Sequence, residues 1–294
     1  HPLCLGAAGL SPKADTHLMP LVQQSDLILA IGYDPIEMRT GWRNPWDPSK
    51  QNVIDIASCP NTHYMHHATL EIVADTGATL EAMAKGIAAR PTWPGGEPQA
   101  TKDALTAAFP VDEDWGPSAI IAETRDVMPE GTLASVDSGA HRILLSQIWD
   151  CDEPRGLIQS TALCTMGCAM PMAIGLKLAR PDRPVVGFMG DAGMLMVAGD
   201  LSTAAELGVA PIFVVFVDAS LALIELKQRQ RQMPNAGVDF GRHDFAALGR
   251  ALGGNGVAVR SRAELRAALT DAMEADCFTV IAAEIDRESY NGRF

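Results

Sequence analysis

The chain has 294 residues, of which 47% are hydrophobic and 20% are charged, so it is long enough for two globular domains with separate cores. Its formal net charge of −13 argues against nucleic acid and against an anionic membrane surface as partners. The apolar run from Ala210 to Val217 is too short to span a bilayer, and no signal peptide is visible. The sequence therefore predicts a globular protein without a nucleic-acid or membrane partner.

The cysteines indicate the cellular compartment, and the first residue indicates how the sequence relates to the full-length protein. The six cysteines, at positions 4, 59, 151, 164, 168 and 277, form neither a CxxC pair nor a dense framework. We therefore expect reduced thiols and a cytoplasmic location. Because the first residue is His1 and not Met, we also expect the sequence to be a fragment or a processed product.

Residues 1–90 have the pattern of an α/β unit. Helical periodicity marks residues 13–25 and 78–89, and short apolar runs predict strands at 26–34, 52–57 and 71–75. Alternating strands and helices imply a parallel sheet. Too few elements precede Asp26 for a complete doubly wound domain, so we expect its opening strand and helix to be missing. This range is predicted to be a partial middle domain of the nucleotide-binding type.

Two stretches of this unit raise the question of a ligand. The loop at residues 39–50 could hold an adenine or a flavin, although ordinary packing of Trp42 and Trp46 is the favoured interpretation. His63, His66 and His67 lie close together, but without a Cys or acid at ligand spacing a polar loop is favoured over a metal site. No GxGxxG turn is present, so the sequence assigns no nucleotide.

A second domain is expected from residue 115 to residue 294. Residues 91–114 contain four prolines and a Gly-Gly pair, and we interpret them as a linker. Beyond the linker, strands are predicted at 132–137, 185–190, 210–217, 255–259 and 277–286, with helices between them. The predicted fold is α/β, with doubly wound parallel sheets in two Rossmann-like domains.

The stretch from residue 185 to residue 220 carries the strongest chemical signal. Asp191 follows one apolar strand in a Gly-Asp-Ala-Gly turn, and Asp218 follows the next strand, 218 − 191 = 27 residues later. Parallel strands end at the same crevice, so both carboxylates can reach one hard cation. The helix that follows the turn offers backbone N–H groups to a phosphate. We expect a metal-plus-phosphate site, the alternative being an ordinary βαβ unit whose acids only cap helices.

These residues resemble the thiamine diphosphate motif, in which GDG is followed by a strand–helix–strand and an Asn-Asn or Asn-Asp pair. The resemblance implies Mg²⁺ ligands at Asp191, the Asp218 side chain and the Ser220 carbonyl. Ala192 replaces the middle glycine of the motif, and Val217 replaces the first Asn. The ligand positions survive because an Asp can replace an Asn as oxygen donor.

The resemblance extends to two other turns. In the family, a turn like the one at residues 138–141 contacts the diphosphate, and a segment like residues 161–179 supports the bent cofactor and accepts a hydrogen bond from its pyrimidine amine. The implied cofactor-binding residues are Ser138, Gly139, Ala140, His141, Cys164, Met166, Ala192, Gly193 and Leu223. Because Ala162, Cys164 and Ala169 replace family glycines, close backbone approach is less assured there.

The substrate side points to one branch of the family. Leu223 and Ile224 are similar to the apolar pair of acetolactate synthase-like enzymes, whereas family decarboxylases that act through an acid have a Glu at the position of Ile224. An apolar wall protects a carbanion from protonation and so favours carboligation over simple decarboxylation. No catalytic residue is assigned to this chain, because the family's Glu belongs to a pyrimidine-binding domain that no stretch here resembles.

The resemblance thus implies a thiamine diphosphate- and Mg²⁺-dependent C–C bond lyase or ligase that acts on a 2-oxo acid. Its expected partners are a pyrimidine-binding domain or subunit and other copies or chains in a dimer or tetramer. FAD or ADP in the middle domain is conceivable from the family but unsupported by the residues. Two alternatives stay open: a non-catalytic cofactor-binding or regulatory subunit, and another phosphate-binding enzyme of the Rossmann type.

Overall fold

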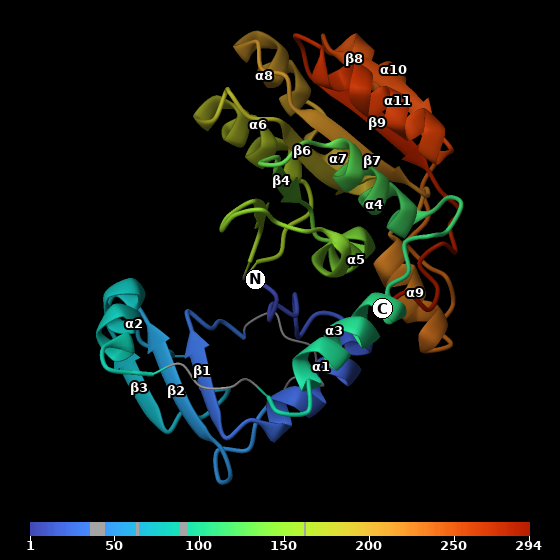
Figure 1. The fold of residues 1–294 in the computed structure, drawn as a ribbon. Coiled ribbons are helices and arrows are strands. Elements are labelled where there is room, and N and C mark those ends of the chain that lie inside the picture. Colours follow the sequence, from blue (N-terminus) through green and yellow to red (C-terminus); the bar gives the residue numbers. More distant parts are fainter. Residues whose placement is uncertain (36–44, 63–64, 89–92, 162) are drawn as a thin grey trace. The chain divides into compact units, whose positions relative to one another are not determined.

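The computed structural model describes residues 1–35, 45–62, 65–88, 93–161 and 163–294. The chain divides into a first unit, His1–Ala108, and a second unit, Phe109–Phe294, and each is described by itself (Figure 1). Trp42 and His63, which the sequence raised as ligand candidates, lie outside the described residues.

The first unit is built around a three-stranded parallel sheet in the order β1-β2-β3. Its strands are β1 (Leu27–Ile31), β2 (Asn52–Ala57) and β3 (Leu70–Val73), and its helices are α1 (Pro12–Gln24), α2 (Thr76–Ala84) and α3 (Glu97–Ala108). The Ser11 hydroxyl begins α1 by accepting the Ala14 N–H at 3.2 Å. The range expected to be a linker thus contains helix α3, which packs against α1. The boundaries proposed for the domains stay a prediction.

An aromatic cluster occupies the loops beyond the strands of this unit. The rings of Tyr33, Trp46 and His66 lie 5.3 to 5.8 Å apart, and the Trp46 indole N–H donates to the His67 carbonyl at 3.0 Å. Tyr33 Oη and His66 Nδ1 are 3.0 Å apart and share a hydrogen bond. Among the described residues, no group of three or more His, Cys, Asp or Glu side chains is arranged to hold a metal ion.

The second unit contains a six-stranded parallel sheet in the order β5-β4-β6-β7-β9-β8. The strands are β4 (Leu133–Val136), β5 (Leu157–Gln159), β6 (Val185–Gly190), β7 (Ile212–Val217), β8 (Asn255–Val259) and β9 (Thr279–Glu284). The helices are α4 (Pro117–Val127), α5 (Ala140–Ile148), α6 (Ala169–Ala179), α7 (Asp191–Val197), α8 (Asp200–Leu207), α9 (Ala222–Gln230), α10 (Phe245–Ala251) and α11 (Arg262–Met273). This arrangement confirms the predicted α/β fold with parallel sheets.

Burial explains why the central strands are continuous apolar runs. Every residue of β7 is buried, because helices cover both faces of the sheet. On one face α6, α8 and α10 pack around Phe213 and Phe278, and on the other α4 packs against α5 and α11. Within the described residues, no helix combines the length and the apolar character needed to cross a bilayer.

The chain changes direction between β4 and β6. From β4 it passes through α5 to β5 on one side, and from β6 it continues through α7 and α8 to β7 on the other side. In an open parallel sheet the crevice at such a switch point, outside the carboxyl ends of the strands, is where ligands bind. The fold therefore directs attention to the turns after β4 and β6.

Candidate active site

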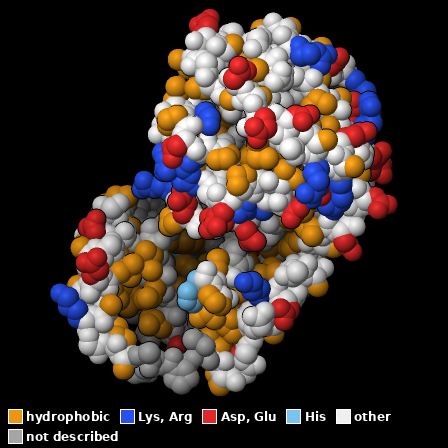
Figure 2. All heavy atoms as spheres, turned by 45° about the horizontal axis from the view of Figure 1, so that its top comes forward, with side chains coloured by type: hydrophobic (Ala, Val, Ile, Leu, Met, Phe, Trp, Pro, Cys, Tyr) orange, Lys and Arg blue, Asp and Glu red, His pale blue; other side chains and the backbone are white. Residues whose placement is uncertain are grey.

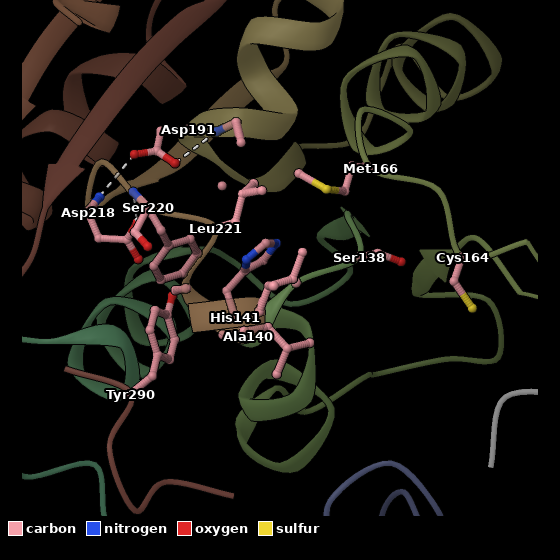
Figure 3. Close-up of a pocket in the computed structure, with 17 residues that line it drawn as sticks. Ser138, Ala140, His141, Cys164, Met166, Asp191, Asp218, Ser220, Leu221 and Tyr290 are labelled. Carbon is pink, nitrogen blue, oxygen red and sulfur yellow. Dashed lines mark hydrogen bonds between the residues drawn. The ribbon is translucent and has the colours of Figure 1, made fainter. Parts of the chain in front are cut away.

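A pocket of about 240 Å³ lies at this switch point, at the carboxyl ends of β4, β6 and β7 (Figure 3). It is lined by Ser138, Gly139, Ala140, His141, Cys164, Met166, Gly190, Asp191, Ala192, Phe216, Asp218, Ser220, Leu221, Ala222, Leu223, Ile224 and Tyr290. Of the residues implied by the family resemblance, Gly193 alone does not line it. The structure thus brings together side chains that are far apart in the sequence.

Asp191 and Asp218 form the acidic part of the pocket. Asp191 accepts three backbone N–H groups, from Ala192 at 2.8 Å, from Ala219 at 2.7 Å and from Asp218 at 3.1 Å. Asp218 Oδ1 accepts the Ser220 N–H at 3.0 Å, while no hydrogen bond to Oδ2 is found in the described part of the chain. Burial raises the pKa of Asp191, and burial together with the Asp191 charge raises the pKa of Asp218 to about 8. Neighbouring positive charge therefore does not offset the cost of ionising both carboxylates.

A polar network fixes the loop that follows β7. Ala219 adopts φ 57, a left-handed conformation that bends the backbone between Asp218 and Ser220. The Ser220 hydroxyl donates to the buried Glu225 carboxylate, which also accepts from Arg229 at 2.6 Å and from Arg287 at 2.7 Å. The two arginines compensate the Glu225 charge, so the carboxylate can hold Ser220 at the edge of the pocket.

His141 forms a second polar point of the pocket. Its ring stacks on Phe216 with centroids 5.2 Å apart, and burial lowers its pKa to about 3. The imidazole is therefore neutral, and its Nε2 has no hydrogen-bond partner among the described residues. A side chain at Gly139 would approach the His141 ring to 2.5 Å, so this position requires glycine. An anion with an oxygen near Nε2 would complete the hydrogen bonding of the imidazole.

Asp137, which directly follows β4, holds the loop before α6 through hydrogen bonds to its carboxylate. Its carboxylate accepts the Gly167 N–H at 2.7 Å and the Ala169 N–H at 2.6 Å, and burial raises its pKa. These bonds present Cys164 and Met166 to the pocket. A Cβ at Gly193 would lie 2.1 Å from Asp137 Oδ2, so this glycine lets α7 pack against the carboxylate. A contact between Gly193 and a diphosphate stays a prediction.

An apolar segment closes another side of the pocket. Leu221 and Leu223 are partly buried, and Ile224 is 48% exposed, because α9 begins at the rim. The segment is uncharged as far as Glu225, whose carboxylate is engaged by Ser220 and the arginines. It provides a hydrophobic wall beside the acidic pair.

The sequence reasoning missed four residues of this region: Asp137, Phe216, Glu225 and Tyr290. Asp137 and Phe216 belong to the predicted strands, and their positions at the strand ends could have indicated them. Glu225 lies among the polar and charged residues of α9, and this pattern does not distinguish it from a solvent-exposed acid. Tyr290 follows the last strand in a turn-rich segment, and nothing in the sequence indicates that it returns to the crevice.

Comparison with known families agrees with this geometry. Residues 137–283 match the C-terminal TPP binding domain of thiamine pyrophosphate enzymes, and residues 1–83 match their central domain. The first match covers the turns after β4, β6 and β7 that form the pocket.

Individual relatives and a solved structure give the same result. The chain is 28% identical over 275 residues to the catabolic acetolactate synthase of Raoultella terrigena, covering 90% of this chain and 49% of that protein. It is 27% identical over 275 residues to acetolactate synthase of Bacillus subtilis, covering 90% and 48%. Benzoylformate decarboxylase from Polynucleobacter necessarius shares the fold, with a TM-score of 0.75, 22% identity and coverage of 92% of this chain and 51% of that one.

The chain thus spans about half the length of these relatives. The match to the C-terminal domain and the shared fold extend across the pocket that the acidic pair and His141 define. Both the residues and the comparisons lead to one assignment. The chain belongs to the thiamine pyrophosphate enzyme family, and it is similar in sequence to acetolactate synthases of that family.

Proposed function

We propose that this chain holds the diphosphate and Mg²⁺ of thiamine diphosphate in a C–C bond lyase or ligase that acts on a 2-oxo acid. The observation that carries the proposal is the pocket at the switch point, where an acidic pair lies beside a neutral histidine with an uncommitted ring nitrogen. A divalent cation would offset the repulsion between Asp191 and Asp218, and an anion would use the His141 nitrogen. A site that binds a divalent cation next to an anion fits a metal-bound diphosphate.

The cation would be held by Asp191, the Asp218 side chain and the carbonyl of Ser220. Asp218 Oδ2, which carries no hydrogen bond in the described part of the chain, is available as a ligand, and hard cations prefer such oxygens. The diphosphate would lie toward Ser138, Gly139, Ala140 and His141, with Ala192 and Gly193 at the start of α7. In this structure the Ala192 N–H is engaged by Asp191 at 2.8 Å.

The remaining residues would orient the cofactor and shape the reaction. Thiamine diphosphate supplies a nucleophilic carbon and an electron sink for C–C bond chemistry. Met166 would support its bend, and the Cys164 carbonyl would accept a hydrogen bond from it. Leu223 and Ile224 would exclude water from the reacting carbon, which protects it from protonation and favours ligation to a second carbonyl.

The proposal includes a partner. In the family that the chain resembles, a Glu on a pyrimidine-binding domain activates the cofactor. We propose that such a domain, in the same protein or in another subunit, completes the site. A dimer or tetramer would bring the two domains together. We propose that the chain catalyses a reaction of the kind its relatives carry out only as part of such an assembly.

Calorimetric titration tests the cofactor site directly. We expect thiamine diphosphate to bind the purified chain in the presence of Mg²⁺ and not after chelation with EDTA. Asp191→Ala should weaken this binding at least about a hundredfold, because it removes a charged ligand and leaves Asp218 without its metal-bridging partner. Asp200→Ala, at the start of α8 outside the pocket, is the matched control and should bind as the wild type does. Wild-type-like binding by the Asp191 variant would refute the site.

Product analysis tests the reaction type. In the assembly that contains the pyrimidine-binding domain, we expect pyruvate to give mainly acetolactate, because the apolar wall at Leu223 and Ile224 slows protonation. Acetaldehyde as the main product would contradict the carboligation proposal. Cofactor binding without any turnover of 2-oxo acids would instead identify a non-catalytic subunit.

A further inference from the structure

Tyr290 enters the pocket from a part of the chain that the cofactor motif does not include. It lies six residues after the end of β9, is only 3% exposed and lines the pocket with Asp191 and Asp218. Figure 3 shows its hydroxyl directed toward the side of the pocket that holds Asp218. Burial, followed by the charges of Asp218 and Asp191, raises its pKa well above the ordinary value. The phenol is therefore protonated at neutral pH and can donate a hydrogen bond to an anionic oxygen.

The Tyr290 hydroxyl has no hydrogen bond within the described residues. Among the nearby carboxylate oxygens, those of Asp191 accept three backbone N–H groups and Asp218 Oδ1 accepts that of Ser220, which leaves Asp218 Oδ2 for the proposed cation. Because Tyr290 lines the pocket, its hydroxyl is suited to donate to an oxygen that a ligand brings there. The Nε2 of His141, another pocket residue, also has no hydrogen-bond partner among the described residues.

The segment that carries Tyr290 is anchored on both sides of it. Before it, Arg287 donates to the buried Glu225 at 2.7 Å. After it, Asn291 accepts from Arg229 at 2.7 Å, and Arg293 pairs with Glu113. Because Glu225 also accepts the Ser220 hydroxyl, the segment and the proposed metal-binding loop share one carboxylate. The position of the phenol is thus tied to that loop by a short chain of contacts.

We propose that Tyr290 is a further cofactor-binding residue, which donates a hydrogen bond to an oxygen of the metal-bound diphosphate and couples the segment 286–294 to cofactor binding. The inference rests on the proposed function and adds a donor outside the motif. A neutral phenol suits this place, because it binds an anionic oxygen without adding a positive charge that would compete with the cation for Asp218. Binding of the cofactor should therefore tighten the segment.

Tyr290→Phe removes only the hydroxyl and leaves the ring in place. We expect it to raise the dissociation constant for thiamine diphosphate with Mg²⁺ about tenfold, which corresponds to about 1.4 kcal/mol. Mg²⁺ with inorganic diphosphate serves as a second probe and should lose a similar factor, since the bond is made to the diphosphate. Tyr33→Phe, in the first unit, is the matched control and should bind as the wild type does.

Hydrogen exchange of the wild-type chain provides a readout that needs no variant. Amides of residues 286–294 should exchange more slowly after thiamine diphosphate and Mg²⁺ are added, and the Tyr290→Phe chain should lose most of this effect. Unchanged exchange in the wild type, or equal affinities of wild type and Tyr290→Phe, would overturn this inference and leave the proposed function intact. Failure of the wild type to bind either probe would overturn the proposed function, and the inference with it.

Discussion

The two sheets of this chain differ in how completely they are covered. In the second unit, β4 and β7 are buried at every position, and β6 and β9 at all but the last. In the first unit, Leu27, Leu29 and Ile31 of the edge strand β1 are 48%, 42% and 44% exposed. Figure 2 shows the same contrast, with hydrophobic side chains gathered on the visible face of the first unit and mixed charges over the second.

The better covered of the two sheets is also the one that carries the candidate site. A parallel sheet is stabilised when helices cover both of its faces, and the second unit achieves this with eight helices in its described residues, α4 to α11. A rigid, covered sheet can hold charged groups such as Asp191 and Asp218 at fixed positions despite the cost of burying them. In its described residues the first unit has three helices, α1 to α3, and its aromatic cluster lies among loops.

The largest expected effect compares the two sheets directly. Phe213 is fully buried in β7, and Phe213→Ala should lower the free energy of unfolding of the second unit by about 3–5 kcal/mol. Leu29→Ala in β1 should cost less than about 1 kcal/mol, because this side chain already contacts solvent. Urea unfolding followed by circular dichroism measures both values. Equal losses would show that the exposed face of β1 is covered in solution.

A smaller effect concerns the electrostatic strain of the pocket. The pKa of Asp218 rises from 3.8 to about 8 on folding, so between these values the folded chain keeps a proton that the unfolded chain has lost. Stability should therefore fall as the pH rises from about 4 to about 8 in metal-free buffer. Asp218→Asn should remove this contribution, so that from pH 5 to pH 8 its stability gains about 4 kcal/mol relative to that of the wild type.

Urea titrations at the two pH values, with EDTA present, check this prediction. Leu29→Ala, which changes no titrating group, should keep the wild-type pH dependence and serves as the control. Identical pH dependence in the wild type and the Asp218→Asn chain would mean that folding does not raise the pKa of Asp218.

Much of the fold follows from local patterns, as particular elements show. The strand predicted at residues 52–57 coincides with β2, because polar residues bound a short apolar run. The helix predicted between the strands at 255–259 and 277–286 is α11, whose first turn is capped by the Ser261 hydroxyl. The Glu264 carboxylate accepts the N–H of Arg260 at 2.6 Å and not that of Ser261, so only half of a capping box is present.

Other elements depend on neighbours that the sequence does not reveal. The three-residue strand β5 exists because β4 offers it an edge, and the helix expected after Asp191 is two helices separated at Ala198–Gly199. The meeting of Asp191 and Asp218 could be predicted, since parallel strands end on one side of the sheet. The return of Tyr290 to that crevice could not, because it depends on the arginine contacts that anchor its segment.

The order of strands in the second sheet has a consequence for folding kinetics. Ile212 pairs with Thr279, 279 − 212 = 67 residues later, and Leu133 pairs with Val185, 185 − 133 = 52 residues later. Such distant pairings close long loops, and they form slowly. The crevice between β4 and β6 can therefore appear only late in folding. A ligand that binds there would select fully folded chains and, by mass action, increase their population.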